Sequence, residues 1–175
     1  MQRVGLLAVS AIGADRPGIV AAVTGVLYDQ GCNLEDTSMT ILRGHFAMTM
    51  VVSGPRDAAE LDAALAGTAQ QLGLVVTVRE ISAEPNEPPP AHPYVVSVHG
   101  ADHPGIVHRI TALLAERGVN VTDLTTRLRE DAYLMELDVE VPADEDVPDL
   151  SAALDSLAAE LAVAVRLHPA DADLL

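Results

Sequence analysis

The sequence predicts an α+β protein built from two copies of one β-α-β-β-α-β unit. Three observations lead to this fold class: an internal repeat at a constant spacing, apolar patterns that switch between strand and helix periods, and a proline-rich stretch between the copies. The chain has 175 residues, enough for two small domains. Apolar residues make up 49% of it but aromatic residues only 2%, so aliphatic side chains must form the cores.

The internal repeat is clearest where residues 13–38 are laid over residues 100–125, at an offset of 87. Twelve of these 26 positions are identical, and the shared stretch reads Gly-Ala-Asp-x-Pro-Gly-Ile-Val. The offset holds as far as Pro55 and Pro142, after which the second copy has two extra residues. The chain is therefore an internal duplication, and the two copies should share one fold.

Each copy opens with a short β-rich run, residues 6–12 and 94–99, followed by an apolar pattern of helical period in residues 17–30 and 104–117. Each helix is expected to begin at the Asp-x-Pro-Gly sequence, with Asp near the N-cap and Pro in the first turn. A glycine follows each helix, which favours a left-handed C-terminal cap.

A strand, a turn and a second strand follow the first helix of each copy. Residues 33–42 and 45–53 are expected to pair around a turn at Arg43-Gly44, and the second copy repeats the pattern around Glu130-Asp131. The methionines of these strands are interpreted as core residues: Met39, Met48, Met50 and Met135.

A second helix and a closing strand, residues 74–81 or 161–167, complete each copy. The order β-α-β-β-α-β corresponds to the ferredoxin-like fold, an antiparallel sheet with both helices on one face. Between the copies, the stretch from Ala83 to Pro93 contains five prolines and should be an extended linker. The predicted divisions are a first domain over 1–83, a linker over 84–93, a second domain over 94–169 and an acidic tail over 170–175.

The charge of the chain argues against binding to polyanions. Its formal net charge is -16, and acidic residues outnumber basic ones in both halves. Nucleic-acid affinity depends largely on cations that neutralise phosphates, and anionic membranes attract basic segments. We therefore expect no direct binding to nucleic acid or membrane, and a small molecule or another protein as the partner.

Other features of the sequence suggest a cytoplasmic protein without catalytic or metal chemistry. The N-terminal stretch lacks the cationic lead and cleavage site of a secretion signal, and the single cysteine, Cys32, is interpreted as a small apolar side chain. His99, His103 and His108 fall on a strand, a turn and a helix, so their spacing does not predict a metal site. We find no nucleophile with its base and no phosphate-binding loop, so neither an enzyme nor a cofactor is expected.

The turn between the first strand and the first helix is the candidate binding site of each copy. The first-turn N–H groups of such a helix are free to hold a carboxylate, and Gly18 leaves the approach to them open. A carboxylate, Asp15 or Asp102, and an amide, Asn33 or Asn120, could hold an ammonium group if both reach one site across an interface. Together these groups describe a receptor for a free amino acid.

A structural interpretation of the same residues stays open. Asp15 and Asp102 could serve only as helix caps, and Asn33 and Asn120 could be turn residues after a helix-ending glycine. A purely structural need would also retain them in both copies.

The sequence GADRPGIV, a helix, GCNLED and a hairpin together resemble the ACT domain, a regulatory module that binds amino acids. The resemblance covers nearly the whole chain as two units. It implies a ligand at an interface between two domains, in contact with the turn before the first helix and the start of the second strand. By position it implies these ligand-binding residues: Asp15, Arg16, Pro17, Gly18, Ile19 and Asn33, with Asp102, His103, Pro104, Gly105, Ile106 and Asn120. The first copy is favoured, because Arg16 is permanently charged whereas His103 titrates.

We therefore expect a cytoplasmic sensor of a small amino acid, glycine or serine, that modulates a protein partner. The resemblance implies that this partner is a transcription factor. The alternative is an assembly module that binds no ligand and holds a partner, or itself, through its sheet edges or helices. A homodimer is expected because exposed sheet edges must be paired or covered.

Overall fold

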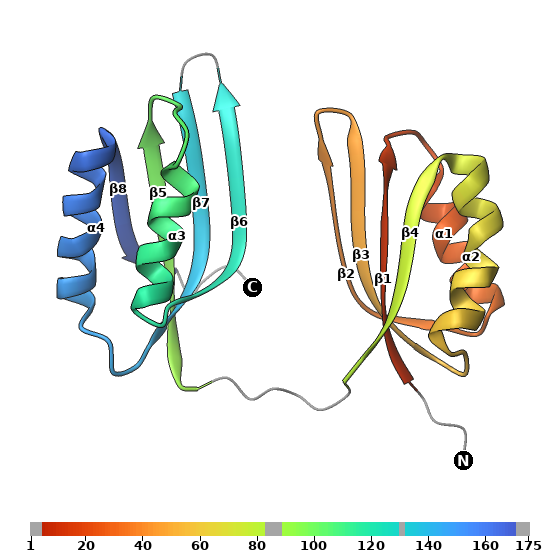
Figure 1. The fold of residues 1–175 in the computed structure, drawn as a ribbon. Helices are drawn as coiled ribbons and strands as arrows, with labels where there is room; N and C mark the ends of the chain where they lie inside the picture. Colours follow the sequence, from red (N-terminus) through yellow and green to blue (C-terminus); the bar gives the residue numbers. More distant parts are fainter. Residues whose placement is uncertain (1–4, 83–88, 130–131, 171–175) are drawn as a thin grey trace. The chain divides into compact units, whose positions relative to one another are not determined.

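The structure is a computed structural model that describes residues 5–82, 89–129 and 132–170. It divides into two units, Met1–Asn86 and Glu87–Leu175. Within the described residues each unit has a four-stranded antiparallel sheet and two helices that cover one face of the sheet (Figure 1). The predicted α+β, ferredoxin-like fold class is therefore confirmed. The predicted turn at Glu130-Asp131, the first half of the predicted linker and the tail after Ala170 lie outside the described residues.

The first unit follows the predicted element order. Its elements are β1 (Gly5–Ala14), α1 (Ile19–Asp29), β2 (Asn33–Leu42), β3 (His45–Gly54), α2 (Ala58–Leu72) and β4 (Leu74–Ile81). The strands lie in the order β2-β3-β1-β4, so β1 is central and β2 and β4 are the edges. The predicted turn between β2 and β3 is confirmed: Arg43 and Gly44 both have positive φ, 49° and 80°, as a tight hairpin turn requires.

The second unit repeats this arrangement. Its elements are β5 (Ala91–Gly100), α3 (Ile106–Glu116), β6 (Asn120–Arg129), β7 (Ala132–Pro142), α4 (Val147–Leu161) and β8 (Val163–Pro169). The strand order is β6-β7-β5-β8, the same as in the first unit. The closing strand begins later than predicted, because α4 continues through Leu161 and ends at Ala162 in a left-handed conformation, with φ of 52°.

The first strand of the second unit begins earlier than the predicted linker allows. Residues 91–93 belong to β5, where Pro93 is paired with Glu140 of β7. The carbonyl oxygen of Pro93 accepts a hydrogen bond from the N–H of Ala170, just past the end of β8, at 3.1 Å. The nitrogen of Pro93 faces the same side as its carbonyl oxygen, the side of β8. Because the β5–β8 ladder has ended there, the missing N–H of Pro93 costs no hydrogen bond between strands.

The core of each unit lies between its sheet and its helices. In β1 the buried residues alternate with residues that face away from the helices; the buried ones are Leu7, Val9 and Ala11. No buried side chain of the described residues is polar or charged. Packing of aliphatic side chains therefore stabilises both units, as the composition predicts.

Three of the four methionines predicted in the core are buried: Met48, Met50 and Met135. The prediction is wrong for Met39, whose side chain is 47% exposed. Met39 lies opposite Met48 on the edge strand β2 and so shares its face of the sheet. Its exposure shows that the helices leave this edge of the sheet uncovered.

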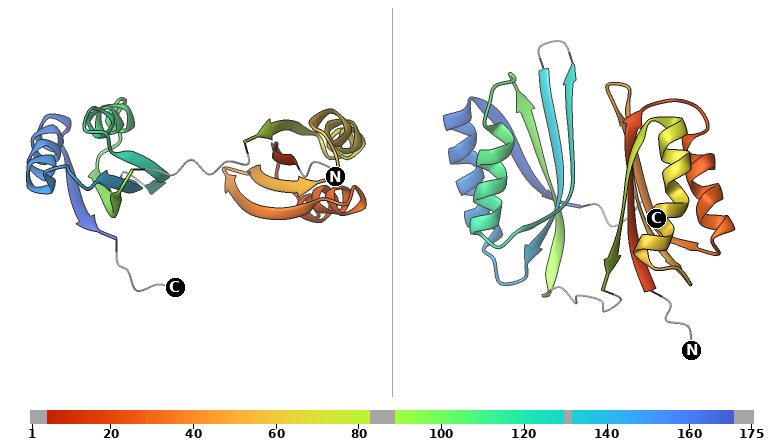
Figure 2. Two further views of the ribbon diagram at one scale, coloured as in Figure 1. Left: turned by 90° about the horizontal axis from the view of Figure 1, so that it is seen from below. Right: turned by 45° about the vertical axis from the view of Figure 1, so that its right-hand side comes forward.

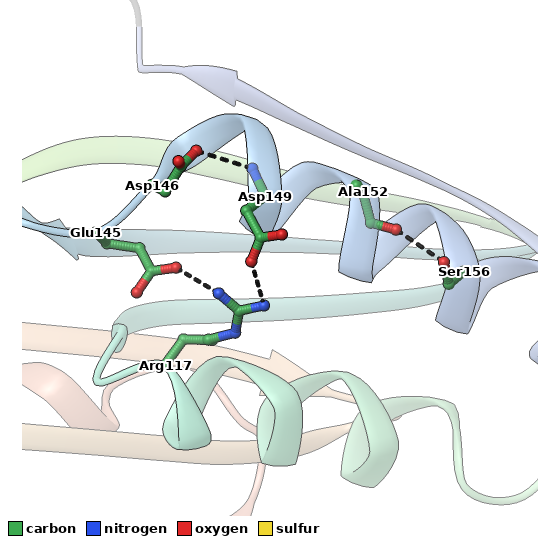
Figure 3. A network of polar contacts seen from close by, with 6 residues as sticks. All are labelled: Arg117, Glu145, Asp146, Asp149, Ala152 and Ser156. Carbon is green, nitrogen blue, oxygen red and sulfur yellow. Dashed lines mark hydrogen bonds and ion pairs between the residues drawn. The ribbon is translucent and has the colours of Figure 1, made fainter.

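A network of ion pairs joins the two helices of the second unit (Figure 3). The guanidinium of Arg117, at the end of α3, lies 2.8 Å from Glu145 and 2.7 Å from Asp149. Asp146 caps α4, because its carboxylate accepts the N–H of Asp149 at 3.1 Å. The hydrogen bond to Asp149 is the main reason that the pKa of Arg117 is raised. The network fixes the end of α3 against the start of α4.

We predict that Gly13→Ala destabilises the first unit, because β1 approaches the start of β4 too closely for a side chain. A Cβ at Gly13 would lie 2.9 Å from the carbonyl oxygen of Gly73 and 2.7 Å from a methyl of Leu74. The free energy of unfolding should fall by about 1–3 kcal/mol, measured by chemical denaturation with circular dichroism. Gly5→Ala is the control, since nothing lies within 4 Å of a Cβ there. Equal stability of the two variants would contradict the prediction.

Candidate functional site

Each candidate site lies at the turn that joins the first strand of a unit to its first helix. The helices α1 and α3 begin after Gly18 and Gly105, whose φ angles are 93° and 100°, and neither has a hydrogen bond from a capping side chain. Gly18 and Gly105 are thus the N-caps, and the alternative that Asp15 and Asp102 serve only as helix caps is wrong. Glycine takes the left-handed conformation without a Cβ penalty, so the chain enters the helix on glycine and the aspartate stays outside.

The start of α1 presents unpaired amide groups. The first intrahelical hydrogen bond runs from the N–H of Ala22 to the carbonyl oxygen of Gly18, at 2.9 Å. The amides of Gly18, Ile19 and Val20 precede this bond, and such groups have no partner within the helix. Together with the helix dipole they favour an anion at this end of the helix.

In the first unit these amides border an open hollow of about 500 Å³. Its wall includes Phe46 of β3 and Met39 of β2, neither of which the sequence assigned to the site. Most of the surface is apolar, and Asp15 is one of the residues that line it. The full lining is Asp15, Arg16, Pro17, Gly18, Ile19, Val20, Ala21, Met39 and Phe46. The alternating pattern of β3 could have indicated Phe46, whereas no signal in the sequence pointed to Met39.

The structure does not bring Asn33 to this hollow. On β3, the partner of Asn33 is Ser53, whereas the partner of Ala14 at the end of β1 is His45. Eight residues of extended strand separate these two positions, a distance of about 27 Å. The side chain of Asn33 instead donates a hydrogen bond to Glu35 at 3.3 Å.

The second unit has the same separation. Its turn holds Asp102, His103, Pro104, Gly105 and Ile106 together, while Asn120 pairs with Glu140 at the far end of the sheet. Within either unit, therefore, the aspartate and the asparagine do not share a site. A site that uses both would require a neighbouring unit.

A basic side chain in each turn contacts the C-terminal end of the second helix of the same unit. Arg16 donates to the carbonyl oxygen of Gln71 at 3.0 Å, near the end of α2. In the second unit, His103 Nε2 lies 2.7 Å from the carbonyl oxygen of Leu161, and Nδ1 lies 3.2 Å from that of Pro104. A positive charge is favoured at a helix C-terminus. The two residues therefore hold their turns in place, a role that the sequence did not indicate.

The contacts of His103 favour its protonated form. Both ring nitrogens face carbonyl oxygens, which only accept hydrogen bonds, so the ring satisfies both when it carries two N–H groups. The bond to Leu161 and then that to Pro104 raise the pKa of His103, and the nearby charge of Asp102 acts in the same direction.

The other candidates from the sequence are not drawn into a site. Cys32 is half-buried against the core of the first unit, and burial raises the pKa of its thiol. Among the described residues no group of three His, Cys, Asp or Glu side chains is placed to hold a metal ion. None of the helices in that part of the chain is long and apolar enough to cross a membrane.

Comparison with known proteins gives concordant findings. Two family models, both described as ACT domain, match residues 6–79 and residues 94–160. The glycine cleavage system transcriptional repressor of Escherichia coli K12 is 32% identical over 162 residues, which cover 89% of this chain and 85% of the repressor. A solved structure of an unknown protein from Galdieria sulphuraria has a TM-score of 0.81 at 28% identity, over 96% of this chain and 99% of that one.

We predict that the second unit becomes less stable as the pH rises through the raised pKa of His103. A group whose pKa is higher in the folded than in the unfolded state stabilises the fold, and it does so fully below its unfolded-state pKa, which is about 6.5 for histidine. This stabilisation is lost as the pH rises through the folded-state pKa. Melting of the full chain at a series of pH values should show the loss. His103→Arg, which copies Arg16, should remove it, and Arg16→His should introduce a similar dependence in the first unit. An unchanged pH dependence in His103→Arg would refute the prediction.

Proposed function

The chain belongs to the ACT-domain family of regulatory modules, and on that premise we propose that it senses a free amino acid and thereby modulates a protein partner. The observation that carries the proposal is the hollow of the first unit, which is lined both by Asp15 and by the first residues of α1, whose amides have no partner within the helix. These are opposite charges at one site, as the two charged groups of an amino acid require.

The hollow can hold an amino acid in one orientation. The α-carboxylate of the ligand would accept hydrogen bonds from the amides of Gly18, Ile19 and Val20, because the positive end of the helix dipole lies there. The ammonium group would pair with Asp15, which the structure leaves exposed and without a capping role. A small side chain would lie against Phe46 and still leave the hollow open. Glycine and serine are the favoured ligands, since the Escherichia coli relative is a repressor of the glycine cleavage system.

The proposed partner is a protein that acts in transcription. The Escherichia coli relative is a transcriptional repressor, but the net charge of this chain, -16, opposes direct contact with nucleic acid. The chain would therefore regulate transcription by binding a transcription factor, and it would do so without catalysing a reaction.

The exposed edge strands favour a second candidate function, a module that assembles with a partner and binds no ligand. On β2, Met39 and Ile41 are 47% and 49% exposed, and on β6, Leu124 and Leu128 are 39% and 49% exposed. Apolar side chains in a row on an open sheet edge are typical of an interaction surface. Capture of the partner with and without amino acids separates the two functions, because capture that never responds to an amino acid supports the assembly module.

We predict that Asp15→Asn weakens amino-acid binding at least about tenfold, because the ammonium group of the ligand would then face a neutral amide in place of the carboxylate. Stability should change little, since Asp15 caps no helix in the structure. Isothermal titration calorimetry of the full chain with the twenty amino acids, glycine and serine first, measures the binding.

The matched control for this prediction is Asp102→Asn, at the equivalent position of the second unit. A loss confined to Asp102→Asn would place the ligand in the second unit instead. The sensor proposal would be overturned if no amino acid gave a heat of binding and none shifted the melting temperature.

A further inference from the structure

The duplication allows the two sheets to be compared position by position on the face that the helices leave uncovered. We call this the open face; in Figure 2 it is the side of each sheet opposite its two helices. On β1 it carries the side chains that alternate with the buried ones, from Leu6 to Ile12. Residues paired across neighbouring strands share a face, so the registers of the strands define rows that cross the sheet.

The open face of the first sheet has two central rows without a charged residue. One row, from β2 to β4, consists of Thr40, Ala47, Ile12 and Val75. The next row consists of Ser38, Thr49, Ser10 and Thr77. Ile12 and Val75 are 54% and 69% exposed, and the hydroxyls of Ser10 and Thr49 lie within hydrogen-bond distance of each other, 3.4 Å. Because these central hydroxyls have a partner, covering them does not leave them unsatisfied.

The open face of the second sheet is charged at the same positions. The row that corresponds to Ile12 consists of Arg127, Leu134, His99 and Ala164. The row that corresponds to Ser10 consists of Thr125, Glu136, Ser97 and Arg166. In the next row Asp123 and Asp138 lie on adjacent strands. Burying this face would desolvate several charges, so it is suited to water.

The charges nearest to the centre of the first open face lie at its two edges. The third row consists of Asp36, Val51, Ala8 and Arg79, with Asp36 on β2 and Arg79 on β4. A twofold axis parallel to the strands, between β1 and β3, exchanges the two edges and keeps each row at its own level. It would therefore place Asp36 of one copy opposite Arg79 of the other, twice. An interface between identical copies requires such self-complementarity.

The same axis pairs large side chains with small ones. It places Ile12 of one copy over Ala47 of the other, and Val51 over Ala8. A hollow of about 210 Å³ on this face, bordered by Ala47 and Thr49, leaves space for the opposite Ile12. Steric fit and charge thus select the same arrangement.

We propose that the open face of the first sheet binds the open face of the first sheet of a second copy of this chain, as two stacked sheets with aligned strands. A fourth row consists of Asn33, Ser53, Leu6 and Ile81. With four strands about 4.8 Å apart and four rows about 6.8 Å apart, each copy would bury about 500 Å². The total of about 1,000 Å² is at the lower end for specific interfaces, so the dimer would dissociate on dilution. The proposal does not depend on amino-acid binding.

The first test transfers one residue between the two faces. Thr49→Glu gives the first sheet the residue that the second sheet has at Glu136, so the fold is known to accept it. It should raise the dimer dissociation constant at least about tenfold, because two unpaired carboxylates become buried near the axis. Glu136→Thr is the control and should leave the constant unchanged. Sedimentation equilibrium of the full chain over a range of concentrations measures both, and circular dichroism checks folding.

The second test exchanges the charges at the edges. Asp36→Arg and Arg79→Asp should each weaken the dimer, because like charges then face each other, and the double variant Asp36→Arg with Arg79→Asp should restore it. The proposal is overturned if the wild-type chain is a monomer at every concentration. It is also overturned if Thr49→Glu dimerises as well as the wild type, or if the double variant is no better than either single one.

Discussion

The constraint on which both units depend is the left-handed glycine between the first strand and the first helix. Gly18 and Gly105 turn the chain into α1 and α3 through left-handed backbone angles, and the first amides of each helix have no capping side chain. The turn in the first unit is held from two sides. The N–H of Asp15 donates to Gly44 of the β2–β3 hairpin at 2.8 Å, and Arg16 donates to the end of α2. The rim of the hollow is therefore tied to two other elements of the unit, although most of its surface is open.

The fold was predictable because each element rests on a local signal that tertiary packing does not override. Alternation in β1 and β3, helical spacing in α2 and the Arg43-Gly44 turn all agree with one another, and the duplication supplies each signal twice. The errors lie at the edges of the sheets, where tertiary packing decides whether a residue is buried or paired. Pro93 is tolerated in β5 because β8 has already ended beside it, and Met39 is exposed because no helix covers β2. Neither fact is contained in the residues themselves.

The site was only partly predictable for a related reason. Residues adjacent in sequence, from Asp15 to Ile19, also lie together in space, so the turn was located correctly. The positions of residues that are distant in sequence were not predicted correctly. Asn33 follows α1 directly, yet the strand order carries it to the opposite end of the sheet from Asp15. A capping role for the aspartate stayed open in the sequence, because capping preference depends on residue type, whereas the structure makes glycine the N-cap through a backbone angle.

Within a duplicated chain, each unit is a control for the other. Positions required by the shared backbone keep their chemistry: the left-handed glycines recur, and so does the basic side chain that contacts the end of the second helix, Arg16 or His103. Positions that face outward have diverged, since the open face of one sheet is uncharged where the other carries acids and bases. A requirement of the fold would act on both copies equally, so it cannot account for this difference. The proposed contact between first sheets accounts for it, because that contact would exclude charge from the centre of one open face and not from the other.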